Sequence, residues 1–193
     1  MEPRDASVAS RLLLAALLAC APALAGADSF RVENFVIHGS SARELRADLA
    51  RLGPIGETGI RGDAYTEYRI AWKFSMTMKD GVCRADNAAV DLDVTMSLPS
   101  WVPPAGVATQ LIATWDRFSE VLREHEDGHH RIAISAAREV RRKLRARTRA
   151  ATCAMLKARL NDTANAVLAE YRERQQDYDR DTDYGRAQGT GVL

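Results

Sequence analysis

Two long segments of the chain alternate between apolar and polar positions, which is the pattern of β-strands buried on one face. Their apolar positions are Tyr68, Ile70, Trp72, Phe74 and Met76 in the first segment, and Val90, Leu92, Val94, Met96 and Leu98 in the second. Lys79-Asp80-Gly81 lies between them and favours a turn. The pattern therefore predicts a long antiparallel hairpin. A shorter strand is predicted earlier, from Phe30 to Ile37.

From about residue 107 the apolar period changes to three or four residues. The positions of this face are Leu111, Trp115, Phe118, Leu122, His125, His129, Ile132, Ala136, Val140 and Leu144. They predict either one long helix or two helices that meet at a bend near Gly128. A C-terminal helix is predicted after Cys153, and a short helix after an N-cap at Ser40 or Ser41. The order of elements predicts an α+β domain whose helices pack on a small antiparallel sheet.

The beginning of the chain has the pattern of a signal peptide. Arg11 precedes the apolar run Leu12–Ala19, which is too short to cross a bilayer. Small residues spaced for cleavage follow between positions 23 and 27. We therefore predict that residues 1–27 are a signal peptide and that residues 28–193 form a single domain, either secreted or periplasmic.

The mode of export has an alternative. Leu17-Leu18-Ala19-Cys20 is a loose lipobox, and lipidation of Cys20 would anchor the protein in a membrane. No other stretch is long and apolar enough for a transmembrane span. The formal net charge of +1 offers no argument for nucleic acid as a partner.

The predicted mature chain keeps two cysteines, Cys83 and Cys153. An even pair in an oxidising compartment predicts a disulfide, and the alternative is two free buried thiols. A dense basic stretch from Arg138 to Arg149 precedes the second of them. Such a stretch is usually a solvated helix face, and the alternative is contact with anionic envelope polymers or lipid headgroups.

The predicted long helix carries the sequence His125-Glu126-Asp127-Gly128-His129. Residues four apart lie one turn apart on one side of a helix, so the two imidazoles can bind one ion. Zinc takes imidazole nitrogens at about 2.0–2.1 Å, and a catalytic site keeps one position for water. Glu126 is then a candidate general base for peptide hydrolysis. The alternatives are two core-edge histidines and a metal site without catalysis.

Two further features of this helix affect the interpretation. Gly128 costs about 1 kcal/mol relative to Ala in a helix, and close approach of substrate or of another segment would explain it. Ile132 and Ser135 stand where a metzincin would have Gly and His, so the third ligand comes from elsewhere. Glu139 is about 15 Å from His129 along the helix and is out of reach.

The chain resembles a family of bacterial predicted secreted zinc-dependent proteases, known as domain of unknown function 922. The residues that carry the resemblance are Gly39 before Glu44-Leu45, Trp72, Cys83, Leu98-Pro99-Ser100-Trp101, the metal motif, Cys153, the block Tyr178–Gly185, and Gln188-Gly189. The resemblance covers nearly all of the predicted mature chain. It implies a zincin-like zinc peptidase with one Zn²⁺ per chain and a peptide or protein substrate.

The third zinc ligand is where this chain departs from the family. The residue before the C-terminal Gly is commonly His there, and Tyr184 stands in its place. We expect the tail to fold back over the helix and to bring Tyr184 to the metal, with Asp183 and Asp179 as alternatives. The departure also favours a competing hypothesis, a catalytically silent envelope-binding protein that kept the fold. A third hypothesis is a purely structural exported domain.

Overall fold

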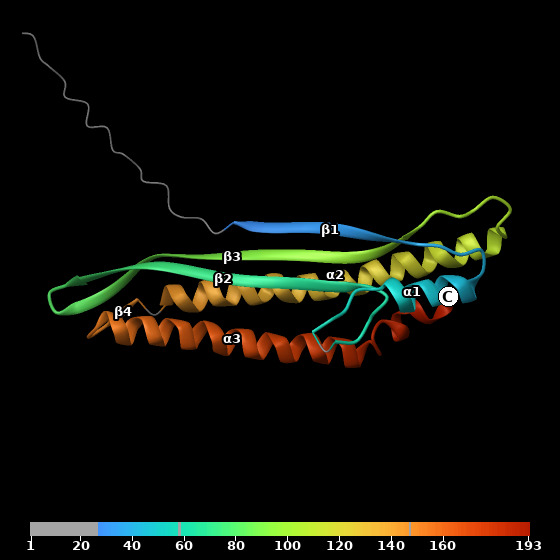
Figure 1. Ribbon diagram of the computed structural model, residues 1–193. Coiled ribbons are helices and arrows are strands. Elements are labelled where there is room, and N and C mark those ends of the chain that lie inside the picture. The colour runs from blue at the N-terminus through green and yellow to red at the C-terminus, as the bar shows by residue number, and fades with distance from the viewer. Residues whose placement is uncertain (1–26, 58, 147) are drawn as a thin grey trace, which may run out of the picture.

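The computed structural model describes residues 27–57, 59–146 and 148–193 (Figure 1). Its elements in chain order are β1 (Asp28–Ile37), α1 (Ala42–Leu52), β2 (Tyr65–Lys79), β3 (Val82–Trp101), α2 (Thr109–Ala146), β4 (Arg149–Ala150), α3 (Cys153–Asp181) and the short 3₁₀ helices η1 (Arg186–Gln188) and η2 (Thr190–Val192). Nearly all of the predicted signal peptide, and with it Cys20, lies outside the described residues. Within the described part, no helix has the length and apolarity that crossing a membrane requires.

The sheet is mixed, and the prediction of an antiparallel sheet was wrong for one strand. β2 and β3 form the predicted antiparallel hairpin, from the pair Tyr65↔Ser97 to the pair Lys79↔Val82. The strand order is β1-β3-β2, and β1 runs parallel to β3. The short strand β4 pairs with β3 near its beginning, at Cys83 and Arg84. β1 and β2 run in opposite directions because the chain turns back through α1. A strand inserted between two opposed strands must be parallel to one of them, and the apolar pattern does not specify which strand is inserted.

The two long helices cover one face of the sheet, as Figure 1 shows. α2 is a single helix of 38 residues without a break at Gly128. Small side chains on its inner face (Ala133, Ala136 and Ala137) are fully buried against the apolar side of the hairpin and the face of α3. A second apolar cluster joins α1 to the first turns of α2 through Leu45, Leu49, Trp101, Trp115, Phe118 and Leu122. The architecture is therefore α+β, with both long helices on one layer of strands.

Cys83 and Cys153 form a disulfide, which confirms the prediction. The bridge joins the beginning of β3 to the first residue of α3. It closes a loop with a sequence separation of 70 residues that contains the whole of α2. The disulfide therefore fixes the end of the helical layer that lies beside the hairpin turn.

Candidate metal centre

The side chains of His125, His129 and Asp179 meet where the middle of α2 packs against the C-terminal part of α3. The Nε2 atoms of the two imidazoles are 3.3 Å apart. Oδ1 of Asp179 lies 3.0 Å from Nε2 of His129 and 3.4 Å from Nε2 of His125. Two nitrogens and one carboxylate oxygen therefore form a nearly equilateral triangle.

The size of this triangle fits a zinc ion. Ligand atoms at 2.0–2.1 Å from a tetrahedral zinc lie about 3.3–3.4 Å from one another. The three edges of 3.0, 3.3 and 3.4 Å are close to that spacing. Two imidazoles with one carboxylate are also a donor set that zinc accepts in catalytic sites, with the fourth position left for water or substrate.

Two glutamine side chains set the orientation of the imidazoles. Oε1 of Gln188 lies 2.9 Å from Nδ1 of His125, and Oε1 of Gln175 lies 2.6 Å from Nδ1 of His129. An amide oxygen only accepts hydrogen bonds, so each Nδ1 carries the ring proton. In its neutral form each ring therefore directs the lone pair of Nε2 into the triangle, which is the tautomer that metal binding needs.

The amide groups are themselves held with their oxygens toward the rings. Gln175 Nε2 donates to the carbonyl oxygen of His129 at 3.1 Å. Gln188 Nε2 donates to the hydroxyl of Tyr178 at 3.2 Å, and that hydroxyl donates to the carbonyl oxygen of His125 at 3.2 Å. Each histidine therefore has an oriented partner, as metal-binding histidines commonly do.

The ring of Tyr178 lies against both imidazoles and explains Gly128. It stacks on His125 with centroids 5.1 Å apart and meets His129 edge-on at 5.0 Å. A Cβ atom at position 128 would lie 2.2 Å from Cζ and from the hydroxyl oxygen of Tyr178. Gly128 is therefore explained by the close approach of another segment, one of the two explanations that the sequence left open.

The carboxylate of Glu126 contacts the sheet through Thr66 and lies close enough to the three triangle residues to interact with their charges. The side chain is buried, and its Oε2 accepts a hydrogen bond of 2.7 Å from the hydroxyl of Thr66 in β2. Burial raises the pKa of Glu126, while Thr66 and the two histidines act in the opposite direction. A pKa above the usual carboxyl value brings the group closer to the neutral range in which a general base works best.

Asp179 and His129 stabilise each other's charged forms. Burial opposes ionisation of Asp179, but its close contacts with His125 and His129 hold its pKa well below the usual range. Burial likewise favours neutral His129, but the hydrogen bonds to Asp179 and Gln175 raise its pKa above 6.5. The carboxylate is thus ionised and ready to bind a cation, and a proton on His129 competes with that cation.

The C-terminal segment folds back over α2, as the sequence predicted. Asp183 (φ 49°), Tyr184 (φ 53°) and Gly185 (φ 80°) lie in succession in the left-handed region and reverse the chain. Tyr184 is 63 % exposed at this turn and makes no hydrogen bond to either imidazole within the described chain. Asp183 pairs with Arg186. Of the three candidates for the third ligand, Asp179 is the residue beside both Nε2 atoms.

A family model described as "Bacterial protein of unknown function (DUF922)" matches residues 32–185, which is most of the chain. The chain belongs to the DUF922 family. DUF922 membership confirms the family that the sequence resembled. The family's description states no activity, so any activity has to be argued from the residues of the site. The comparisons with curated proteins and with solved structures found no match.

Several residues of the DUF922 site were not assigned a role from the sequence: Thr66, Gln175, Tyr178 and Gln188. A signal for two of them was present, because the apolar stripe of α3 that ends at Tyr171 continues at steps of three and four. Those steps reach Gln175, Tyr178 and Asp179 on the face that packs against α2. Gln188 follows in a 3₁₀ turn, where no such period operates.

The basic stretch of the DUF922 domain is partly neutralised within the chain. Arg141 donates to the carbonyl oxygen of Val90 and pairs with Asp28. Arg142 and Lys143 both pair with Glu139. Other members of the stretch, namely Arg138, Arg145 and Arg149, are exposed. Contact of this face with anionic polymers or headgroups stays a prediction.

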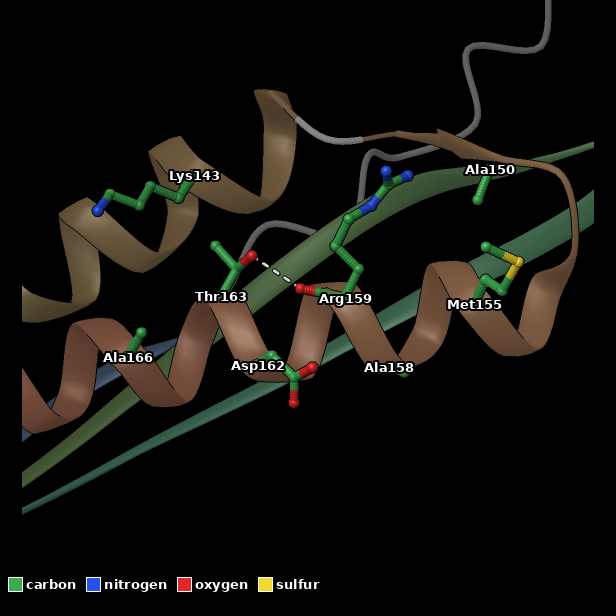
Figure 2. Close-up of a pocket in the computed structure, with 8 residues that line it drawn as sticks. All are labelled: Lys143, Ala150, Met155, Ala158, Arg159, Asp162, Thr163 and Ala166. Carbon is green, nitrogen blue, oxygen red and sulfur yellow. Dashed lines mark hydrogen bonds between the residues drawn. The ribbon is translucent and has the colours of Figure 1, made fainter.

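A groove between the C-terminal part of α2 and the first half of α3 lies apart from the metal centre (Figure 2). It is lined by Lys143, Ala150, Met155, Ala158, Arg159, Asp162, Thr163 and Ala166. Lys143 is about 21 Å along α2 from His129 at 1.5 Å per residue. Of the residues that line the groove, none is a histidine and a single one is a carboxylate, so it lacks the ligand set of the candidate centre.

Proposed function

We propose that this protein is a zincin-like zinc peptidase of the bacterial envelope, either secreted or periplasmic, in which His125, His129 and Asp179 bind one Zn²⁺. The observation that carries the proposal is the triangle of two Nε2 atoms and one carboxylate oxygen with edges of 3.0–3.4 Å. The disulfide supports an oxidising compartment. The predicted signal peptide, residues 1–27, and the alternative lipid anchor at Cys20 belong to the same proposal.

Each residue of the centre has a distinct role in peptide hydrolysis. Zinc held by this ligand set would lower the pKa of a bound water toward about 7 and polarise the scissile carbonyl. Glu126 is the general base, which takes a proton from the attacking water and delivers it to the leaving amine. Thr66 fixes the Glu126 carboxylate through their 2.7 Å hydrogen bond. Gln175 and Gln188 hold the imidazoles in the ligating tautomer.

A second candidate function is metal binding without catalysis, in a silent envelope-binding protein. The burial of Glu126 favours it, because only 4 % of the residue is exposed and its carboxylate is engaged by Thr66. A general base must reach the water whose proton it takes. In this second function Glu126 would be a structural residue beneath β2.

Hydrolysis of a peptide library by purified, zinc-loaded protein separates the two functions. If the protein is a peptidase, Glu126→Gln should retain zinc and lose activity by a factor of about a hundred or more, the usual contribution of a general base. Glu120→Gln changes an exposed carboxylate on the same helix and is the matched control. Full activity in Glu126→Gln rules out the proposed mechanism, and zinc binding without cleavage of any library peptide by the wild type supports the silent protein.

A further inference from the structure

The metal centre depends on the position of the C-terminal segment 182–193. Gln188, which orients His125, lies on this segment. A Cβ atom at Gly185 would be 3.3 Å from Cγ of His125, so the backbone of the segment runs directly over the imidazole. The carbonyl oxygen of Gly185 accepts hydrogen bonds from the amides of Gln188 (3.0 Å) and Thr190 (3.2 Å). Gln188 and Thr190 therefore belong to one compact turn.

One side chain from a distant part of the chain attaches this turn to the domain. Arg46 in α1 donates from Nη2 to the carbonyl oxygen of Thr190 at 2.9 Å and from Nε to the backbone oxygen of Leu193 at 3.1 Å. Its Nη1 pairs with Asp63 at 2.6 Å. The guanidinium also lies over the ring of Phe118, 5.1 Å from its centroid. All three nitrogens of one planar group are thus in use.

We propose that Arg46 is a positioning residue of the metal centre, which acts through the segment 182–193 and Gln188 on the imidazole of His125. Arg46 lies 79 positions before His125 in the numbering (125 − 46) and contributes no metal ligand. The inference rests on the proposed function only in that the site binds a metal. It predicts that metal affinity is set in part from α1.

The physical reason is the cost of holding the segment in place. Gln188 is exposed, and its hydrogen bond to His125 must compete with water. Thr190 is only 5 % exposed. If Arg46 were removed and the turn stayed against α2, the carbonyl oxygen of Thr190 would lose its hydrogen-bond donor and water could not fully replace it, which costs free energy. The turn therefore spends more time away from α2 in the absence of Arg46. His125 then loses the acceptor that keeps its proton on Nδ1.

A double-mutant cycle in zinc affinity tests this route. Removal of an outer partner of a metal-binding histidine usually weakens affinity by about 10–100-fold, and this range is expected for Gln188→Ala. Arg46→Met should weaken zinc binding by about tenfold or more. If Arg46 acts through Gln188, the double variant should bind zinc no more weakly than Gln188→Ala alone. Arg43→Met, which removes an exposed arginine from the same helix, should bind zinc as the wild type does.

Two outcomes of this cycle would overturn the inference. Wild-type affinity in Arg46→Met is one, and fully additive losses in the double variant are the other, because additivity means that Arg46 supports the fold in general. If Arg46→Met does not fold, Arg46→Lys replaces it in the zinc-affinity measurement. It keeps a positive charge beside Asp63 but not the planar fork. Its affinity should fall as in Arg46→Met, and wild-type affinity in the lysine variant would exclude a role for the fork.

A readout without metal separates failure of the inference from failure of the proposed function. Nitrogen NMR of the histidine side chains in metal-free protein at pH 8 reports which ring nitrogen of His125 carries the proton. Wild type should show Nδ1–H, and Arg46→Met should show an increased Nε2–H fraction. If the wild type binds no zinc but the tautomer still shifts, the metal proposal fails and the positioning role of Arg46 stands. An unchanged tautomer in Arg46→Met refutes that role.

Discussion

Replacement of Gly128 by alanine should destabilise the protein, although helix propensity alone predicts the opposite. Alanine is favoured over glycine by about 1 kcal/mol within a helix. The added methyl, however, would lie 2.2 Å from Cζ and from the hydroxyl oxygen of Tyr178. The ring cannot move without breaking the hydrogen bonds that its hydroxyl makes with His125 and Gln188. The sign of the change in unfolding free energy therefore shows whether helix propensity or the clash with Tyr178 is the larger effect.

The magnitude follows from three contributions. Overpacking of a well-filled site costs about 1–3 kcal/mol. The two hydrogen bonds contribute about 0.5–1.5 kcal/mol each. After the helix-propensity gain of about 1 kcal/mol is subtracted, Gly128→Ala should reduce the free energy of unfolding by about 1–5 kcal/mol. With a urea slope of about 2 kcal/mol/M, a loss of about 3 kcal/mol lowers the midpoint by about 1.5 M.

The assay is urea unfolding followed by circular dichroism, with the disulfide intact and a chelator present so that metal loss is not measured. Ser135→Ala, an exposed change on the same helix, is the control and should be neutral or slightly stabilising. In a Tyr178→Ala background the clash is absent, and Gly128→Ala should then stabilise by up to about 1 kcal/mol. A Gly128→Ala protein as stable as the wild type, or more stable, would refute the close approach of Tyr178.

Two further predictions follow from the same structure. Zinc affinity should fall as pH falls through the pKa of His129. Burial disfavours the charged imidazole, but the hydrogen bonds to Asp179 and Gln175 raise this pKa above the usual 6.5. Because a proton and the ion compete for Nε2, the loss of affinity should approach about tenfold per pH unit below that pKa. Competition with a zinc-binding dye from pH 5.5 to 8 measures this, and a flat profile contradicts it. Replacement of both Cys83 and Cys153 by serine should lower the free energy of unfolding by about 4 kcal/mol, the loop entropy for a separation near 70 residues; urea unfolding of the variant checks it, and unchanged stability counts against it.

The sequence predicted the parts of the fold that a local period specifies. Alternation over β2 and β3 and the stripe of α2 are long enough to identify both the type of element and its buried face. The parallel pairing of β1 with β3 was missed because a strand's pattern defines its faces and not its neighbours. The break considered at Gly128 is absent because the glycine serves packing against Tyr178 and not a bend.

The same distinction applies to the site. His125 and His129 could be paired from their spacing, since one helix places both on one side. Asp179 is 50 residues beyond His129 and reaches the triangle through the packing of α3 on α2, which the sequence left as one of three alternatives. Tyr184 was favoured through the family's usual histidine. The left-handed turn at Asp183, Tyr184 and Gly185, which places the phenol at the surface, is a backbone property that side-chain identity does not reveal.

Zinc binding by the purified protein and by two single variants tests the metal centre most directly. Equilibrium dialysis with metal analysis should find one zinc per wild-type chain and one per chain in Tyr184→Phe. Asp179→Ala removes one of the three ligand atoms and should weaken affinity by at least about a hundredfold, because the ion is left with two protein ligands. Absence of stoichiometric zinc in the wild type would contradict the centre. Wild-type affinity in Asp179→Ala together with loss in Tyr184→Phe would contradict the assignment of Asp179 as the third ligand.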